Sequence, residues 1–119
     1  MKNYDLEERT INFSLEVINL CKKIESNTIN NPLVSQLVRS ATSVGANYQE
    51  ANGASSKKDF LNKIYLCKKE AKESAYWLRI LRNSTPPLTD GLLKIEDEAQ
   101  QLVLIFGKIA YSTNKLKNL

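Results

Sequence analysis

Apolar residues recur at alternating steps of three and four along almost the whole chain, and this spacing constrains the fold most strongly. Such a repeat places the apolar side chains on one face of a helix, which must be buried against other helices. Four segments show the repeat, at Leu6, Thr10, Phe13, Val17, Leu20 and Ile24, at Val34, Leu37, Ala41, Val44, Tyr48 and Ala51, at Phe60, Ile64, Cys67, Ala71, Ser74, Leu78 and Leu81, and at Leu88, Leu92, Ile95, Ala99, Leu102, Phe106, Ile109, Thr113 and Leu116.

Turn signals separate the four segments. Pro32 is expected at the first position of the second helix, and Ser55 or Ser56 at the N-cap of the third, with Asp59 as a capping-box partner. Pro86 and Pro87 separate the third helix from the fourth, because proline cannot continue a helix interior. We therefore predict an all-α protein, an antiparallel up-down-up-down four-helix bundle forming one domain over 1–119, with helices at about 5–25, 32–52, 56–83 and 88–117.

The stretch "SATSVGANYQEANGASSKKD" (40–59) resembles a phosphate-binding loop only in its glycines. Neither Gly45 nor Gly53 belongs to a P-loop or dinucleotide-binding pattern, and no strand precedes them. Gly53 is expected in the left-handed conformation just after the second helix. Gly45 is expected to allow close packing of a neighbouring helix on a low-relief surface made by Ser40, Ala41, Ser43, Gly45 and Ala46.

The chain has no histidine, which removes the usual general base, the usual metal ligand and every nucleophile that depends on histidine. We therefore expect no enzymatic activity, cofactor or metal. An all-carboxylate metal site is the remaining alternative, if Glu50, Glu70, Glu73, Glu96 and Glu98 face inward. The plainer expectation for Glu50 is an ion pair with Arg39 or with a cation of the third helix. Cys21 and Cys67 are expected to be reduced thiols in the core.

The third helical segment separates its charges. At 100° per residue its cations fall in one arc, and tyrosines lie between them. The alternative is a solvated helix face whose lysine stems cover apolar surface. We predict that the arc binds nucleic acid, with cations against phosphates and aromatic faces for unpaired bases, through Lys57, Lys58, Lys68, Lys69, Lys72, Arg79, Arg82 and Tyr65.

A second apolar strip on the same helix, formed by Leu66, Trp77 and Ile80, shares its sector with acidic residues. Packing within the bundle could bury part of it. Together with Ile11, Leu15 and Ile18 of the first helix, the strip predicts a homo-oligomer interface. It also motivates an alternative function, a scaffold that docks a protein partner such as a reverse transcriptase without touching nucleic acid.

The N-terminal residues have no apolar core of the signal-peptide type, and no segment reaches about 18 apolar residues. These features predict a cytoplasmic protein. The formal net charge of +4 agrees with an acidic partner.

Two stretches, "ERTINFSLEVINLCKKI" (8–24) and "QLVRSATSVGANYQEANGASSKKDFLNKIYLCKKEAKESAYWLRIL" (36–81), resemble the bacterial four-helix-bundle family named for proteins encoded in 23S rRNA intervening sequences. The resemblance covers nearly the whole chain. Its most specific pieces are "SVGAN" (43–47), "EA" (50–51) and "YWL" (76–78). Tyr48 departs from the aliphatic residue of many relatives, so we expect this position to be interfacial or partly exposed.

The resemblance implies a barrel-like homopentamer without enzymatic activity, whose basic surface binds nucleic acid, and RNA is the nucleic acid that we expect. Some relatives are accessory proteins of the reverse transcriptases of diversity-generating retroelements and bind both the polymerase and RNA. Five copies of a chain with net charge +4 would carry about +20, so repeated basic surfaces would gain avidity.

Overall fold

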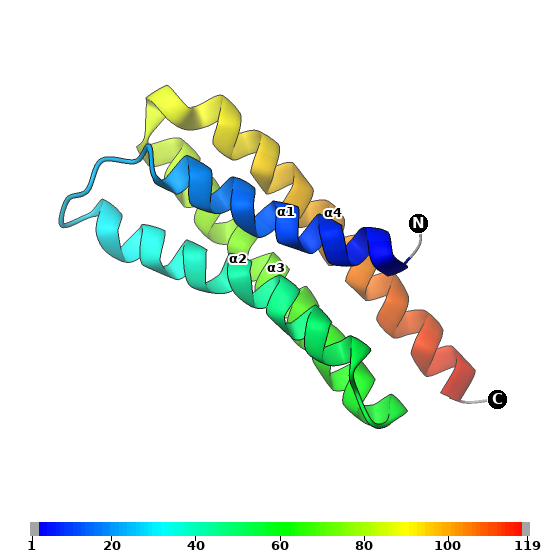
Figure 1. Cartoon of the computed structure of the whole chain (residues 1–119). Helices are drawn as coiled ribbons and strands as arrows, with labels where there is room; N and C mark the ends of the chain where they lie inside the picture. The colour runs from blue at the N-terminus through cyan, green and yellow to red at the C-terminus, as the bar shows by residue number, and fades with distance from the viewer. Residues whose placement is uncertain (1–2, 118–119) are drawn as a thin grey trace.

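The computed structural model describes residues 3–117, and side chains between residues 6 and 115. It contains α1 (Asn3–Cys21), α2 (Asn30–Asn52), α3 (Lys57–Ser84) and α4 (Thr89–Lys117), with a short 3₁₀ helix, η1 (Pro86–Leu88), before α4. Successive helices run antiparallel and form a bundle of 52 × 21 × 20 Å (Figure 1). This confirms the predicted all-α four-helix bundle.

The helices form a ring of neighbours, in which α3 packs against α2 and α4, and α1 packs against the same two helices from the opposite side. Figure 1 shows the α1–α2 and α3–α4 connections at one end of the bundle and the α2–α3 turn at the other. Among the described residues, no helix combines the length and the hydropathy that crossing a membrane requires.

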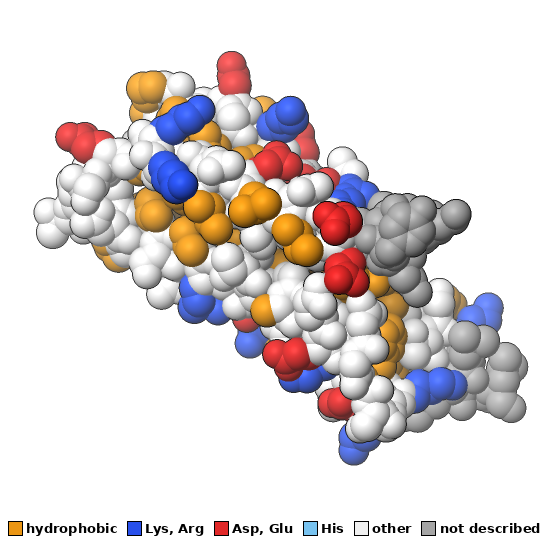
Figure 2. Space-filling model, in the orientation of Figure 1, with side chains coloured by type: hydrophobic (Ala, Val, Ile, Leu, Met, Phe, Trp, Pro, Cys, Tyr) orange, Lys and Arg blue, Asp and Glu red, His pale blue; other side chains and the backbone are white. Residues whose placement is uncertain are grey.

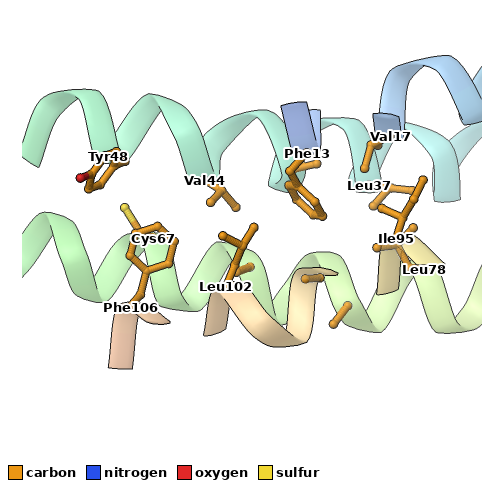
Figure 3. Close-up of a cluster of buried hydrophobic side chains, with 14 of the residues drawn as sticks. Phe13, Val17, Leu37, Val44, Tyr48, Cys67, Leu78, Ile95, Leu102 and Phe106 are labelled. Carbon is orange, nitrogen blue, oxygen red and sulfur yellow. The ribbon is translucent and has the colours of Figure 1, made fainter. Parts of the chain in front are cut away.

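The predicted seams form most of the core, although positions near the helix ends such as Leu20 and Leu88 are half-buried and the side chain of Leu116 lies outside the described residues. Phe13, Leu37, Leu78, Leu102 and Phe106 are almost completely buried and meet at the bundle axis (Figure 3). Tyr48 is only 2% exposed, and its ring lies 5.9 Å from that of Phe106, centroid to centroid. The expectation that Tyr48 is interfacial or partly exposed is therefore wrong within this chain, because Phe106 of α4 covers its ring.

The low-relief surface of α2 is confirmed in part. Ser40, Ala41 and Gly45 are buried, and a Cβ at Gly45 would lie 3.3 Å from Thr10 Oγ1 of α1. Glycine at this position thus lets α1 approach α2 closely. Ala46 is exposed, so its inclusion in the contact surface was wrong.

Three helix boundaries differ from the prediction by two residues or more, and the first is the start of α1 at Asn3 rather than near 5. Helix α1 ends at Cys21 rather than near 25, because the next amides bond three residues back, Lys23 N to Leu20 O and Ile24 N to Cys21 O, both at 3.0 Å. Helix α2 begins at Asn30, because Asn27 Oδ1 accepts the backbone N–H of Asn30 at 2.7 Å. Pro32 is therefore the third helical residue and not the first, still within the turn whose N–H groups need no helical partner.

The α2–α3 turn supports one prediction and corrects another. Ser56 is the N-cap of α3, and its hydroxyl accepts the backbone N–H of Asp59 at 3.0 Å. Gly53 has a φ of −99° and is not left-handed. Helix α2 ends instead through short-range bonds from Gly53 N to Glu50 O and from Ala54 N to Ala51 O.

Both cysteines are buried free thiols, as predicted. Burial raises the pKa of Cys21 to about 11 and that of Cys67 to about 12. Because the thiolate is the reactive form, both side chains act as inert core residues.

Substitutions at Gly45 and Gly53 should change the free energy of unfolding in opposite directions, because only the side chain at Gly45 would meet a neighbouring helix. Gly45→Val should destabilise the fold by about 1–3 kcal/mol, because its side chain would overpack against Thr10. The matched control, Gly53→Ala, has no neighbouring atom closer than 3.8 Å and should stabilise by about 0.4–1 kcal/mol. Urea denaturation measures both, and equal stability of the two variants would contradict the close α1–α2 contact.

Modification of the thiols should require unfolding. At pH 8 a disulfide reagent should react slowly with the native protein, and the rate should rise together with the unfolded fraction in urea. Cys21→Ser isolates Cys67 and gives its rate separately. Reaction of Cys67 in native buffer at the rate of a free cysteine would contradict its burial.

Candidate nucleic-acid interface

A buried hydrogen bond between two serines connects α2 and α3 and favours one register between these helices. The hydroxyls of Ser40 and Ser74 share a hydrogen bond of 2.8 Å between helices, and both residues are fully buried. A slip of α3 along α2 would break this bond and leave each hydroxyl only the carbonyl acceptor of its own helix, Leu37 O at 3.2 Å for Ser40 and Glu70 O at 2.8 Å for Ser74. The pair therefore favours one register and determines which charges meet beside it.

Next to the serine pair, α2 neutralises the acidic sector of α3. Arg39 lies against Glu70 at 3.3 Å and against Glu73. The indole Nε1 of Trp77 donates a hydrogen bond of 3.0 Å to Glu73 Oε2. The bond from Trp77, followed by the pairing with Arg39, holds the pKa of Glu73 below its ordinary range.

Two cations of α3 are also engaged by neighbouring helices. Lys63 binds Glu50 of α2 at 2.6 Å, which confirms the expected pairing of Glu50 with a third-helix cation. Arg82 binds Glu96 of α4 at 2.5 Å, and both side chains are largely buried. Arg82 was predicted to contact nucleic acid, and this pair makes it the least available residue of the predicted set.

The remaining predicted cations form what we call the basic face of α3. All are exposed, and none takes part in an ion pair within the described part of the chain: Lys57, Lys58, Lys68, Lys69, Lys72 and Arg79. Tyr65 lies among them and is 46% exposed. The face shown in Figure 2 differs, because there acidic and basic side chains are mixed around hydrophobic ones.

Helix α4 adds residues that the sequence prediction did not include. Asn114 Nδ2 donates a hydrogen bond of 3.2 Å to the hydroxyl of Tyr65, and Tyr111 and Lys115 line the same hollow beside Lys68. Tyr111 and Lys115 are four residues apart and so share one face of α4. In an antiparallel bundle the start of α3 lies beside the end of α4. This arrangement, together with the four-residue spacing, is the sequence signal that could have identified Tyr111 and Lys115.

The predicted interface strip is less exposed than other apolar surface. Leu66, Trp77 and Ile80 are half-buried. Ile11 and Leu15 of α1 are 39% and 51% exposed, although the seam of α1 is buried. The assignment of Leu66, Trp77 and Ile80 to an oligomer interface stays a prediction, and α1 offers additional apolar surface.

The carboxylates considered for a metal site are each paired with a cation. Glu98 binds Arg9 at 2.6 Å, while Glu50, Glu70, Glu73 and Glu96 each face a cation described above. No cluster of three potential ligands occurs among residues whose positions the structure describes. The side chains do not build the all-carboxylate site.

The pairing of Glu73 can be followed through Trp77, the only tryptophan of the chain. Because the folded pKa of Glu73 is lowered, its charged form stabilises the fold at pH values above the ordinary pKa of a glutamate, and this contribution is lost as the pH falls through the folded pKa. Trp77 fluorescence should therefore change with a midpoint below the ordinary pKa of a glutamate. Arg39→Ala should move the midpoint upward, whereas Lys63→Ala should not. An unmoved midpoint in Arg39→Ala would contradict the pairing.

Comparison with known proteins agrees with this architecture. A family model described as 23S rRNA-intervening sequence protein matches residues 2–107. A crystal structure of a protein of unknown function, from the S23 ribosomal protein family of Bacteroides thetaiotaomicron, is 29% identical, with a TM-score of 0.83 over 93% of this chain and 99% of the other. Comparison with curated proteins gives no match. The chain belongs to the 23S rRNA-intervening sequence protein family.

Proposed function

We propose that this chain is a non-enzymatic, homo-oligomeric nucleic-acid-binding protein of the cytoplasm, which binds RNA and acts as an accessory factor. The observation that carries the proposal is the unequal pairing of charges on α3. Its acids Glu70 and Glu73 are engaged by Arg39 of α2, while the six cations of the basic face have no ion-pair partner among the described residues.

Unpaired lysines and arginines on one helix face suit a phosphate backbone. Each phosphate that is neutralised releases condensed counterions, so binding is driven by entropy and weakens steeply with salt. The pairing of Glu70 and Glu73 with Arg39 offsets two of the three acidic charges of α3 that would repel such a backbone. RNA is favoured because the family is named for intervening sequences of 23S rRNA.

Self-association would strengthen this binding. Ile11 and Leu15 present apolar side chains to solvent on α1, and Leu104 does so on α4. Burial of such side chains between copies is the usual driving force for association. We propose a pentamer, which would repeat the basic face of α3 around one particle and add avidity.

A scaffold that docks a protein partner without contacting nucleic acid is the second candidate. The exposed apolar residues Ile11, Leu15 and Leu104 favour it. Its distinguishing result would be a partner complex that survives both nuclease and high salt, because phosphate contacts would not.

Charge reversal on the basic face tests the proposal. A variant carrying Lys68→Glu, Lys72→Glu and Arg79→Glu should lose RNA affinity, and the slope of log affinity against log salt should fall by about 2, since each phosphate contact contributes about 0.7. Fluorescence anisotropy with a labelled RNA at several salt concentrations measures both quantities.

The matched control reverses three exposed cations that lie outside the basic face: Lys22, Lys23 and Lys94. Both variants change the net charge equally, so long-range attraction changes to a similar extent. An equal loss of binding in the control would contradict a defined interface. Absence of RNA binding by the unaltered protein at low salt would contradict the proposed function itself.

A further inference from the structure

A hollow between α3 and α4 adjoins the basic face. Its volume is about 520 Å³, and its lining comes from both helices: Tyr65, Lys68, Gly107, Ala110, Tyr111, Asn114 and Lys115. A second hollow of about 490 Å³ runs along α3 and is lined by Tyr65, Lys68, Lys69, Lys72, Glu73 and Tyr76. The two share Tyr65 and Lys68 and therefore form one groove, which we call the tyrosine groove.

The tyrosines of this groove present their rings to solvent. Tyr65, Tyr76 and Tyr111 are 46%, 56% and 70% exposed. Two of them are held in position, because the hydroxyl of Tyr65 accepts the bond from Asn114 and the ring of Tyr76 lies edge-on to Trp77 at 4.9 Å between centroids. Rings that are positioned and exposed in this way can stack on a flat partner with little further loss of side-chain freedom.

Gly107 of α4 lines the groove opposite Lys68. A glycine within a helix such as α4 is unfavourable relative to alanine. A Cβ at Gly107 would lie 3.8 Å from both Cε and Nζ of Lys68, so the end of the lysine lies over the space that a larger side chain would fill. A methyl group at this position would make only ordinary van der Waals contact with Lys68, whereas a larger side chain would enter the groove beside the tyrosines.

The charged side chains of the groove that have no ion-pair partner among the described residues are all lysines. Lys68, Lys69, Lys72 and Lys115 line it and are exposed. Its one carboxylate, Glu73, is bound by Arg39 and Trp77. Exposed rings alternating with unpaired cations match a ligand that offers both flat faces and negative charge.

We propose that the tyrosine groove binds single-stranded nucleic acid, with unpaired bases stacked on Tyr65, Tyr76 and Tyr111 and phosphates against the neighbouring lysines. This inference rests on the proposed nucleic-acid-binding function and defines its ligand further. In a duplex the bases are already stacked on one another, so their faces are closed to side chains, whereas single strands offer every base face.

Two labelled probes test the inference, an oligouridine strand and a perfectly paired RNA duplex of the same length. The unaltered protein should bind the single strand more tightly than the duplex at equal salt. Tyr65→Ala combined with Tyr111→Ala should weaken single-strand binding by about 5- to 150-fold for each stacked base lost. Duplex binding should be unchanged, and the salt slope of single-strand binding should be retained, since no phosphate contact is removed.

Two further variants keep the test independent of folding. Tyr65→Phe with Tyr111→Phe keeps the rings and should retain most of the single-strand affinity. Gly107→Leu should fill the groove and weaken single-strand binding selectively, while circular dichroism verifies that each variant is folded. Equal binding of strand and duplex, with the tyrosine variants unaltered, would overturn this inference and leave the basic face standing. Failure to bind either probe at low salt would overturn both proposals.

Discussion

The hydrogen bond between Ser40 and Ser74 is the contact on which the rest of this structure depends most. Small side chains surround it, since Ala41 of α2 and Ala71 and Ala75 of α3 are also buried, and they let the two helices approach closely. Apolar packing of such small residues specifies position weakly. A hydrogen bond between two buried hydroxyls specifies it better, because misplacement loses this bond and leaves each hydroxyl only the carbonyl acceptor of its own helix.

The charge pattern follows from this register. With Ser74 opposite Ser40, the adjacent Arg39 meets Glu70 and Glu73, and Glu50 meets Lys63 further along. On the other side of α3, Glu96 of α4 takes up Arg82. The neighbouring helices thus engage two of the three acids of α3, Glu70 and Glu73, and two of its cations, Lys63 and Arg82, and they leave the outward cations without ion-pair partners among the described residues. The bundle thereby separates the charges that pair between helices from the exposed cations that can bind a ligand. The exposed tyrosines lie beside these exposed cations.

Local sequence patterns were sufficient to predict the helices and the core, but not the contacts between side chains on the surface. The repeat of Phe13, Leu37, Leu78 and Phe106 predicted the core, and Ser56 predicted a helix start, because burial and capping depend on a few neighbouring residues. The pairing of Arg82 with Glu96 and the meeting of Tyr65 with Asn114 depend on the register between helices, which a helical wheel for one helix does not contain. Gly53 shows a similar limit, since short-range bonds end α2 without the left-handed residue that glycine suggested.

Lysine footprinting tests the central claim, that binding uses the face of α3 and the end of α4, most directly. The protein is acetylated at low salt with and without a single-stranded RNA, and each lysine is quantified by mass spectrometry. The account predicts protection of lysines in and beside the groove, Lys68, Lys69, Lys72 and Lys115, with unchanged reaction of the exposed lysines elsewhere, Lys22, Lys23 and Lys94. Equal protection of both sets, or protection of the second set alone, would contradict it.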